Sequence, residues 1–279
     1  MYPYIHIGQG GIGVYGLCIA LGGILAGLLA LFNCKYSKLN RYDMLEMITL
    51  LIVGAIVGAK LLFIVVSWDT ITAMFEAYGI NNDTLLNVMQ GGYVFYGGFI
   101  GGLLAIVLYS RSKYAVRNNI HLIHYLMTIA PVIPLAHAFG RIGCFMAGCC
   151  YGIPDERFGI AFTHSLGAPN GIKLFPVQLL ESFLLFILAA VMQIYFAKSK
   201  HRHCVIYIYL LAYPVIRIIT ERFRYDNAER GIYFGLSTST WISIAILAVG
   251  AVIMILDYKK NRFNEPPEPE IILTQKKNV

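Results

Sequence analysis

Seven long apolar runs, separated by short segments that hold most of the charged residues, constrain this chain more than any other feature. Each run has about 20 residues, the length that a helix needs to cross the hydrocarbon of a bilayer. We predict spans at about 12–33, 44–67, 92–110, 119–138, 177–197, 204–220 and 237–257. Only 13% of the residues are charged, about half of what a soluble domain carries. The sequence therefore predicts an all-α polytopic membrane protein with about seven transmembrane helices.

The apolar part of the chain predicts a single integral-membrane domain over residues 1–263. Residues 264–279 are short on apolar side chains and contain the run EPPEPE, so we expect a disordered polar tail there. Residues 2–11 contain no lysine or arginine. We therefore do not expect a cleavable secretory signal peptide, which needs a positively charged start.

Lysine and arginine alternate between the predicted loops. The segments 1–11 and 68–91 contain none, whereas the loops 34–43, 111–118 and 198–203 contain three each. By the positive-inside rule the N-terminus lies outside and the C-terminus in the cytoplasm. The formal net charge of +7 is therefore interpreted as a topology signal, and we expect no nucleic-acid partner.

Two predicted outer segments break this alternation. The segments 139–176 and 221–236 face outward in this topology and yet hold Arg141, Arg157, Lys173, Arg222, Arg224 and Arg230, with Arg217 just inside the preceding span. Arginine suits phosphate because its planar fork donates two parallel hydrogen bonds. An anionic ligand at the outer face explains these charges. The alternative is that they only pair with Glu221, Asp226 or Glu229.

Residues 140–152, GRIGCFMAGCCYG, combine an arginine, three cysteines and four glycines beside apolar helices. A charge at membrane depth is costly and is treated first as a functional group. Glycines let the backbone approach a ligand closely. We therefore place the candidate site at this segment.

Ordered motifs along nearly the whole chain resemble the prolipoprotein diacylglyceryl transferase family. The last of them, Y-x-x-x-R-x-x-x-E-x-x-R, places Tyr213, Arg217 and Glu221 on one helical stripe. The matching segments are VYGL at 14–17, GAK at 58–60, GGYVFYGGFIG at 91–101, GRIGCF at 140–145, PVQLLE at 176–181 and YPVIRIITERFR at 213–224.

Enzymes of this family move a diacylglyceryl group from phosphatidylglycerol to the lipobox cysteine thiol of a prolipoprotein and release glycerol-1-phosphate. The resemblance implies a multi-pass enzyme of the bacterial plasma (inner) membrane with its active site near the outer face. The implied partners are phosphatidylglycerol, the prolipoprotein signal peptide and the bilayer. It implies no cofactor.

The resemblance also assigns roles to individual residues. Arg141 and Arg217 would clamp the phosphate, and Glu221 and Arg224 would orient them. The other substrate-binding residues that it implies are Tyr15, Cys144, Gly152, Gln178, Glu181 and Tyr213.

Several signature positions depart from the family pattern. The usual histidine base is Tyr96, the signature asparagine is Cys144, an acidic residue is Cys149, and an arginine is Lys60. Tyrosine, with an ordinary pKa of about 10, is a poor base at neutral pH unless a cation lowers that pKa. The alternative base is His137, which shares a helical face with Arg141 and is otherwise a packing residue.

The clustered cysteines, Cys144, Cys149 and Cys150, leave several interpretations open. Together with His137 their spacing fits no common zinc site, and adjacent cysteines chelate one ion awkwardly, so we predict no metal. A disulfide between Cys144 and Cys149 or Cys150 is one alternative at an oxidising face. A thiol relay, or simple space filling, are the others.

Small residues predict where helices approach closely. Gly97 and Gly98 with Gly101 and Gly102 form small-x-x-x-small pairs, and Gly22, Gly23 and Gly27 are interpreted in the same way. Residues 237–240, STST, are interpreted as the N-cap of the last helix.

Two other functions compete with the transferase. One keeps the phosphatidylglycerol site and changes the acceptor, as the altered Tyr96, Cys144 and Cys149 suggest. The other is a non-catalytic seven-helix receptor or lipid-binding protein, which leaves the spacing of Arg141, Arg217 and Glu221 unexplained.

Overall fold

A computed structural model describes residues 3–7, 10–118, 120–165, 167–226 and 231–259. Within these ranges six helices are long and apolar enough to cross a membrane, and a seventh apolar helix, over Tyr96–Ser110, is shorter. This confirms the predicted all-α polytopic membrane class. The predicted tail at 264–279, together with Glu229 and Arg230, lies outside the described residues.

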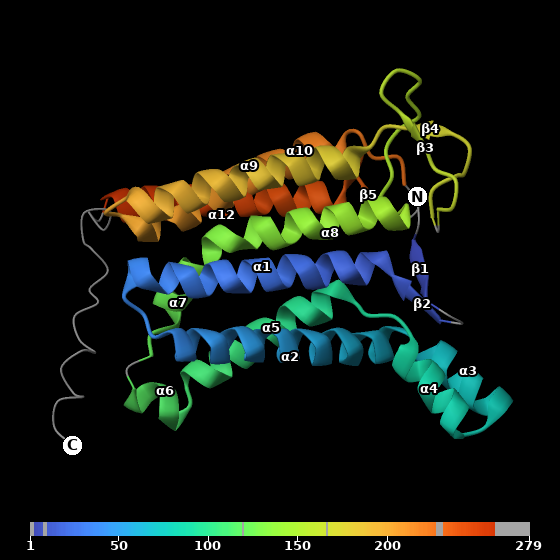
Figure 1. Cartoon of the computed structure of the whole chain (residues 1–279), viewed down its shortest axis with the longest axis horizontal. Helices are drawn as coiled ribbons and strands as arrows, with labels where there is room; N and C mark the ends of the chain where they lie inside the picture. Colours follow the sequence, from blue (N-terminus) through green and yellow to red (C-terminus); the bar gives the residue numbers. More distant parts are fainter. Residues whose placement is uncertain (1–2, 8–9, 119, 166, 227–230, 260–279) are drawn as a thin grey trace. The chain divides into compact units, whose positions relative to one another are not determined.

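The helices pack into two compact units, Met1–Leu39 with Leu126–Val279 and, between them in sequence, Asn40–Tyr125. In the first unit neighbouring helices follow the order α1, α8, α9, α10 and α12. Figure 1 shows these helices running side by side. The elements of the first unit are β1 (Tyr4–Ile7), β2 (Gly10–Gly13), α1 (Val14–Ser37), η1 (Ala130–Val132), α8 (Ile133–Ala147), β3 (Ile160–Ala161), β4 (Lys173–Leu174), α9 (Val177–Lys198), η2 (Arg202–Cys204), α10 (Val205–Glu221), β5 (Ile232–Tyr233), β6 (Leu236–Ser237) and α12 (Thr238–Lys259).

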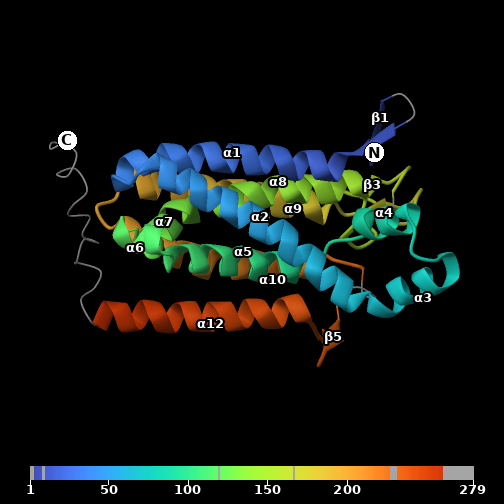
Figure 2. The same ribbon diagram turned by 90° about the horizontal axis from the view of Figure 1, so that it is seen from below.

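Three short antiparallel hairpins, β1–β2, β3–β4 and β5–β6, lie at one end of the first unit. Figures 1 and 2 show them beyond the same ends of the helices. They belong to the segments that the charge pattern predicts on one side of the membrane. That this side is the outside of the cell stays a prediction.

The fourth predicted span, 119–138, is wrong at its end. The helical path runs over Leu122–Ala147, through α7 (Leu122–Ile129), the 3-10 turn η1 and α8. The turn contains Pro131 and α8 begins with Pro134 in its first turn; because proline lacks an amide N–H, the regular α-helix is interrupted there. The helix then continues to Gly148, whose φ of 74° ends it in the left-handed region. Arg141 and Cys144 therefore lie on a helix and not in an outer loop.

The second unit contains α2 (Arg41–Val66), α3 (Trp68–Tyr78), α4 (Asn82–Gln90), α5 (Phe95–Ser110) and α6 (Lys113–Arg117), and α7 begins at its end. The predicted loop 68–91 thus carries two helices, α3 and α4. The Asn81 side chain caps α4 by accepting a hydrogen bond from the amide of Thr84 at 2.8 Å. The helix observed in place of the predicted span 92–110 is shorter than the prediction, since α5 begins only at Phe95.

Helices α2 and α5 pack through bare backbone. A Cβ added to Gly58 would lie 2.3 Å from the carbonyl oxygen of Gly97, and one added to Gly101 would lie 2.3 Å from that of Gly54. Only hydrogen fits at these contacts, which confirms the small-x-x-x-small interpretation of α5.

In α1 the same interpretation holds for one glycine and fails for two. A Cβ on Gly22 would meet Phe139 of α8 at 2.6 Å, whereas nothing lies within 4 Å of one on Gly23 or Gly27. The prediction failed there because spacing does not tell which helical face meets a neighbour.

Candidate functional site: a buried ionic network

Helices α8, α9 and α10 bring buried charges together in the first unit. The Glu181 carboxylate of α9 contacts Arg141 of α8 at 3.0 Å and Arg217 of α10 at 3.1 Å. Both guanidinium groups are therefore held by one acid. Arg217 also contacts Glu221, one turn further along α10, at 2.8 Å, as the predicted helical stripe requires.

The network continues beyond the end of α10. Arg224 lies 3.6 Å from Glu221 and forms a second ion pair with Asp226. Its Nε also donates to Asp226 at 2.9 Å. Burial alone would lower the pKa of Arg224, but the hydrogen bond with Asp226 and the nearby negative charges together raise it above its ordinary value. Arg217 and Arg224 are thus paired as the alternative interpretation proposed, but with Glu181 as an additional and central partner.

The charged side chains of this network are buried. The side chains of Glu181, Arg217 and Arg141 are 2%, 8% and 12% exposed. Because removing ions from water costs more than a typical pair returns, a buried network of this kind is weak evidence for stability. It is better evidence for function in a membrane segment.

Two buried polar atoms of this region have no hydrogen-bond partner among the described residues, Arg141 Nε and Gln178 Oε1. The other end of the Gln178 amide is fixed, since its Nε2 donates to the carbonyl oxygen of Cys149 at 2.7 Å. A buried unpaired donor and acceptor are rare in folded proteins and call for an explanation. A bound ligand with an anionic acceptor and a donor group supplies one.

Backbone hydrogen bonds join the segment after α8 to the segment after α10. Ile153 donates its amide to Phe223 at 2.9 Å, and Tyr225 donates to Tyr151 at 3.1 Å. Gly152 lies between these contacts, where an added Cβ would be 2.3 Å from the Phe175 carbonyl oxygen. The structure thus gives Gly152 a backbone role that holds Arg224 in place, beside its predicted role in substrate binding.

His137 and the tyrosines of α10 form an aromatic group on one side of the network. The His137 ring lies 5.5 Å from that of Tyr213, which stacks on Tyr209 at 5.3 Å. His137 is on α8, one turn before Arg141. The continuing helix that this pairing required is therefore present, and its role as a base stays a prediction.

The two remaining tyrosines lie in different units. Tyr15 is in the first turn of α1, and its ring would be 3.0 Å from a Cβ on Gly143 of α8. Tyr96 is in the first turn of α5 in the second unit, with 56% of its surface exposed. Lys60 of the same unit donates to the Gly91 carbonyl oxygen at 3.1 Å and so fixes the turn before α5. The role of Tyr96 stays a prediction.

All six cysteines are free thiols. The sulfur atoms of Cys144, Cys149 and Cys150 lie within 4.8 Å of one another. Hydrogen bonds with Cys144 and Cys149 lower the pKa of the Cys150 thiol, and the positive charges of Arg224 and Arg141 lower it further. Hydrogen bonds with Cys144 and Cys150 raise the pKa of Cys149. The sequence analysis expected adjacent cysteines to chelate one ion awkwardly, and the structure brings all three sulfurs within 4.8 Å of one another.

One network partner was assigned another role from the sequence. The Ser239 hydroxyl accepts a hydrogen bond from Arg217 Nε at 2.6 Å, although the STST run suggested only an N-cap. The cap itself is confirmed, because Ser237 Oγ accepts from the amide of Thr240 at 3.2 Å. A motif read for local structure thus also holds the central arginine.

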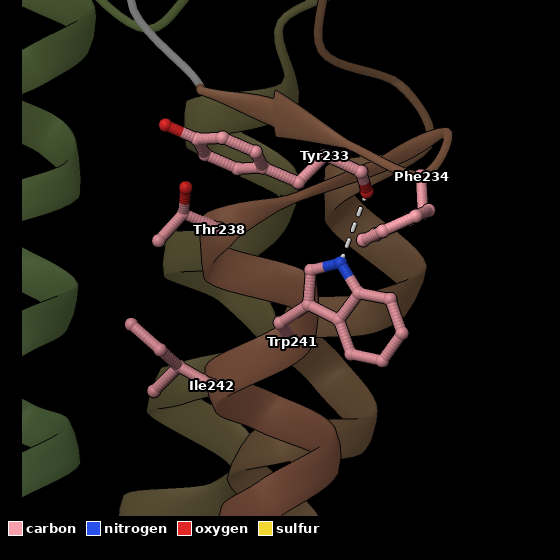
Figure 3. Close-up of a pocket in the computed structure, with 5 residues that line it drawn as sticks. All are labelled: Tyr233, Phe234, Thr238, Trp241 and Ile242. Atoms are coloured by element: carbon pink, nitrogen blue, oxygen red, sulfur yellow. Dashed lines mark hydrogen bonds between the residues drawn. The ribbon is translucent and has the colours of Figure 1, made fainter.

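A separate hollow lies where the β5–β6 hairpin meets α12. It is lined by Tyr233, Phe234, Thr238, Trp241 and Ile242. Figure 3 shows the Trp241 indole N–H directed at the Tyr233 carbonyl oxygen, which accepts its hydrogen bond at 3.0 Å. Among the described residues, no charged side chain lines this hollow, so its lining is more apolar than that of the ionic network.

Comparison with known proteins agrees with this arrangement of motifs. The chain matches the sequence profile of the prolipoprotein diacylglyceryl transferase family over residues 3–256. It is 36% identical to the phosphatidylglycerol–prolipoprotein diacylglyceryl transferase of Clostridium tetani (strain Massachusetts / E88) over 244 residues, which cover 87% of this chain and 92% of the relative. A Clostridium perfringens (strain 13 / Type A) relative, whose name is the same with the number 2, is 33% identical over 253 residues, 89% of this chain and 92% of the relative. The chain therefore belongs to the prolipoprotein diacylglyceryl transferase family.

Proposed function

We propose that this protein transfers the diacylglyceryl group of phosphatidylglycerol to the lipobox cysteine thiol of prolipoproteins. Membership of the family supports the reaction. The observation that carries the site is the buried network around Glu181, in which Arg141 keeps an unpartnered donor. Any ligand for that donor has to supply an acceptor, and a phosphate oxygen does so.

Arg141 is the residue of the network best placed to receive the phosphate. Among the described residues it has one carboxylate partner, Glu181, and it shares that partner with Arg217. Arg217 is engaged on all sides, with Glu181, Glu221 and Ser239. Arg141 thus offers hydrogen-bond donors to an anion, while Arg217 holds Glu181 in position. The two arginines of the proposed phosphate clamp therefore have different roles.

The reaction needs a thiolate and a stabilised leaving group. The sulfur attacks the glycerol carbon of the diacylglyceryl group, and the bond from that carbon to the phosphate oxygen breaks. The electron pair leaves with the oxygen, so the departing glycerol-1-phosphate gains a negative charge. Preorganised guanidinium groups that stabilise this charge lower the barrier. The thiol proton passes to a base, Tyr96 or His137.

The polar groups beside Arg141 suit the rest of the headgroup. Gln178 Oε1 is buried and unpartnered, so it accepts a hydrogen bond from a hydroxyl of the glycerol headgroup. The hydroxyl groups of Tyr15 and Tyr213 add further donors. We place this site near the outer face of the bacterial plasma membrane, where the charge pattern predicts the hairpins.

The test is to express the chain in a bacterium depleted of its own transferase and to measure the mass of a reporter prolipoprotein. We expect the gain of one diacylglyceryl group. No gain from a correctly inserted protein would reject the proposal. A gain on another acceptor would support the alternative enzyme that uses phosphatidylglycerol.

Variants locate the site. We expect Arg141→Ala to abolish modification, and Arg141→Lys not to restore it, because lysine keeps the charge and loses the planar fork. Cys18→Ala serves as the control, since this thiol has no place in the network and the variant should retain activity. Full activity of Arg141→Ala would show that the phosphate binds elsewhere.

A further inference from the structure

Three sulfur atoms converge at the end of α8. Cys144 lies in the last turn of the helix, and Cys149 and Cys150 follow its capping residue Gly148. Their sulfurs all lie within 4.8 Å of one another. Thiolates bound to one zinc ion at about 2.3 Å in a tetrahedral arrangement are about 3.8 Å apart. The cluster is therefore close to the size that a single ion requires.

The backbone is arranged to make this convergence possible. Gly148 and Cys150 both have left-handed backbone, with φ of 74° and 53°, which is unfavourable for a residue with a Cβ. Ser165 Oγ donates to the Gly148 carbonyl oxygen at 3.1 Å and Gln178 donates to that of Cys149 at 2.7 Å. The turn that aims two adjacent cysteines at Cys144 is thus held from two other segments.

We propose that Cys144, Cys149 and Cys150 bind one thiophilic metal ion, Zn²⁺ by the chemistry of three thiolates. A disulfide would use two of the sulfurs and leave the third without a purpose, whereas a metal ion uses all three. Three thiolates and a divalent cation carry one negative charge in total. Arg141 lies on the same helix, one turn before Cys144, and offsets that charge.

Three protein ligands leave the fourth position of a tetrahedral zinc ion open, as in catalytic zinc sites. Resting on the proposed function, we assign that position to the incoming cysteine of the prolipoprotein. Coordination would ionise this thiol outright, and its proton would pass to water in place of Tyr96 or His137. The bound sulfur then attacks the glycerol carbon, and the carbon–oxygen bond breaks toward the phosphate held by Arg141. This activation needs no histidine at position 96.

Metal binding is tested on the purified full-length protein, kept reduced, without reference to activity. After loading with Zn²⁺ and dialysis we expect about one ion per chain by elemental analysis. Loading with Co²⁺ should produce thiolate-to-cobalt charge-transfer absorption. Cys144→Ser and Cys150→Ser should remove both signals. Cys18→Ser and Cys34→Ser are matched controls from the same chain and should keep them.

Three outcomes of these experiments would contradict the proposed metal site. Wild-type protein that takes up no ion, or lacks the charge-transfer band, contradicts the proposal even if a variant fails to fold. So does an unchanged band in Cys144→Ser. A disulfide within the cluster, found by mass spectrometry in protein purified without reductant and still present after metal loading, would replace the metal site by a cystine.

The assigned role has its own readout. A lipobox peptide with its cysteine should shift the absorption of the cobalt protein, and the same peptide with serine should not. Absence of any shift would overturn the fourth-ligand assignment. Transfer activity that survives complete removal of zinc would also overturn it and leave the proposed function intact. A metal-loaded protein that never transfers lipid would reject the proposed function and leave the metal site standing.

Discussion

The end of α8, α9 and α10 in the first unit and the α2–α5 pair in the second bring their helices together in different ways. The first uses buried charges, which are rare in membrane helices, and the second uses glycines, which are common in them. The first region buries a carboxylate between two arginines, at 3.0 and 3.1 Å. The second brings two backbones so close that a single Cβ would lie 2.3 Å from a carbonyl oxygen. Ion pairs join the helices of the first region, whereas glycines without side chains allow the helices of the second to pack closely.

This difference leads us to expect different consequences of substitution in the two regions. Buried ions are expensive, so the network in the first unit is retained at a cost in stability. Close glycine contacts between helices add van der Waals attraction without polar groups, and they stabilise a helix pair in lipid. We therefore expect changes in the first region to affect activity most and changes in the second to affect folding most.

The largest effect is expected for Arg217→Ala. This change removes the ion pair of Glu181 with Arg217 and the 2.8 Å ion pair of Glu221 with Arg217. The ion pairs of Glu181 with Arg141, at 3.0 Å, and of Glu221 with Arg224, at 3.6 Å, remain. Removing one partner from a buried ion network costs about 3–5 kcal/mol, and we expect transfer activity to be lost as well. Thermal unfolding in detergent and the reporter prolipoprotein assay measure the two effects. An unchanged unfolding temperature would show that the network is not energetically coupled.

The next comparison asks which unit supplies the base. Tyr96→Phe removes a hydroxyl of the second unit, and His137→Ala removes an imidazole of the first. Loss of a general base lowers the rate by about 100-fold or more while lipid binding remains. Single-turnover rates with bound phosphatidylglycerol identify the residue. If both variants keep the wild-type rate, another group activates the thiol, as the zinc assignment expects.

A smaller effect on stability is expected in the glycine contact. Gly58→Ala places a Cβ against the Gly97 carbonyl oxygen and should destabilise the second unit by about 1–3 kcal/mol through overpacking. Gly23→Ala is the matched control, since nothing lies within 4 Å of its added Cβ. Equal unfolding temperatures for the two variants would contradict the close approach of α2 and α5.

The smallest effect is expected at the surface ion pair of Lys173 and Glu156. Lys173 Nζ lies 3.2 Å from Glu156 Oε2, but the side chain of Lys173 is 51% exposed and that of Glu156 is 88% exposed. An exposed pair contributes about 0–1 kcal/mol, so Lys173→Ala should leave the free energy of unfolding almost unchanged. A loss as large as that of Arg217→Ala would remove the distinction between buried and exposed charges.

Part of the candidate site was accessible from the sequence. The spacing of Arg217 and Glu221 predicted their contact, because residues four apart in a helix are neighbours. Arg141, Glu181 and Arg224 were named through the motifs they belong to. The sequence did not predict that two arginines share Glu181, or that Arg217 donates a hydrogen bond to Ser239. These partners come from different helices, and sequence spacing does not relate residues on different helices.

The sequence by itself determined the class of the protein and named residues that the structure brings into one buried network. Apolar runs of about 20 residues form membrane helices, because hydrocarbon offers no partners to backbone N–H and C=O groups. Tertiary structure decided which helical faces meet, how far α8 extends, and that three thiols gather beyond its end. A helical period shows which residues share a face, but the rotation and packing of each helix set which face it presents to a neighbour.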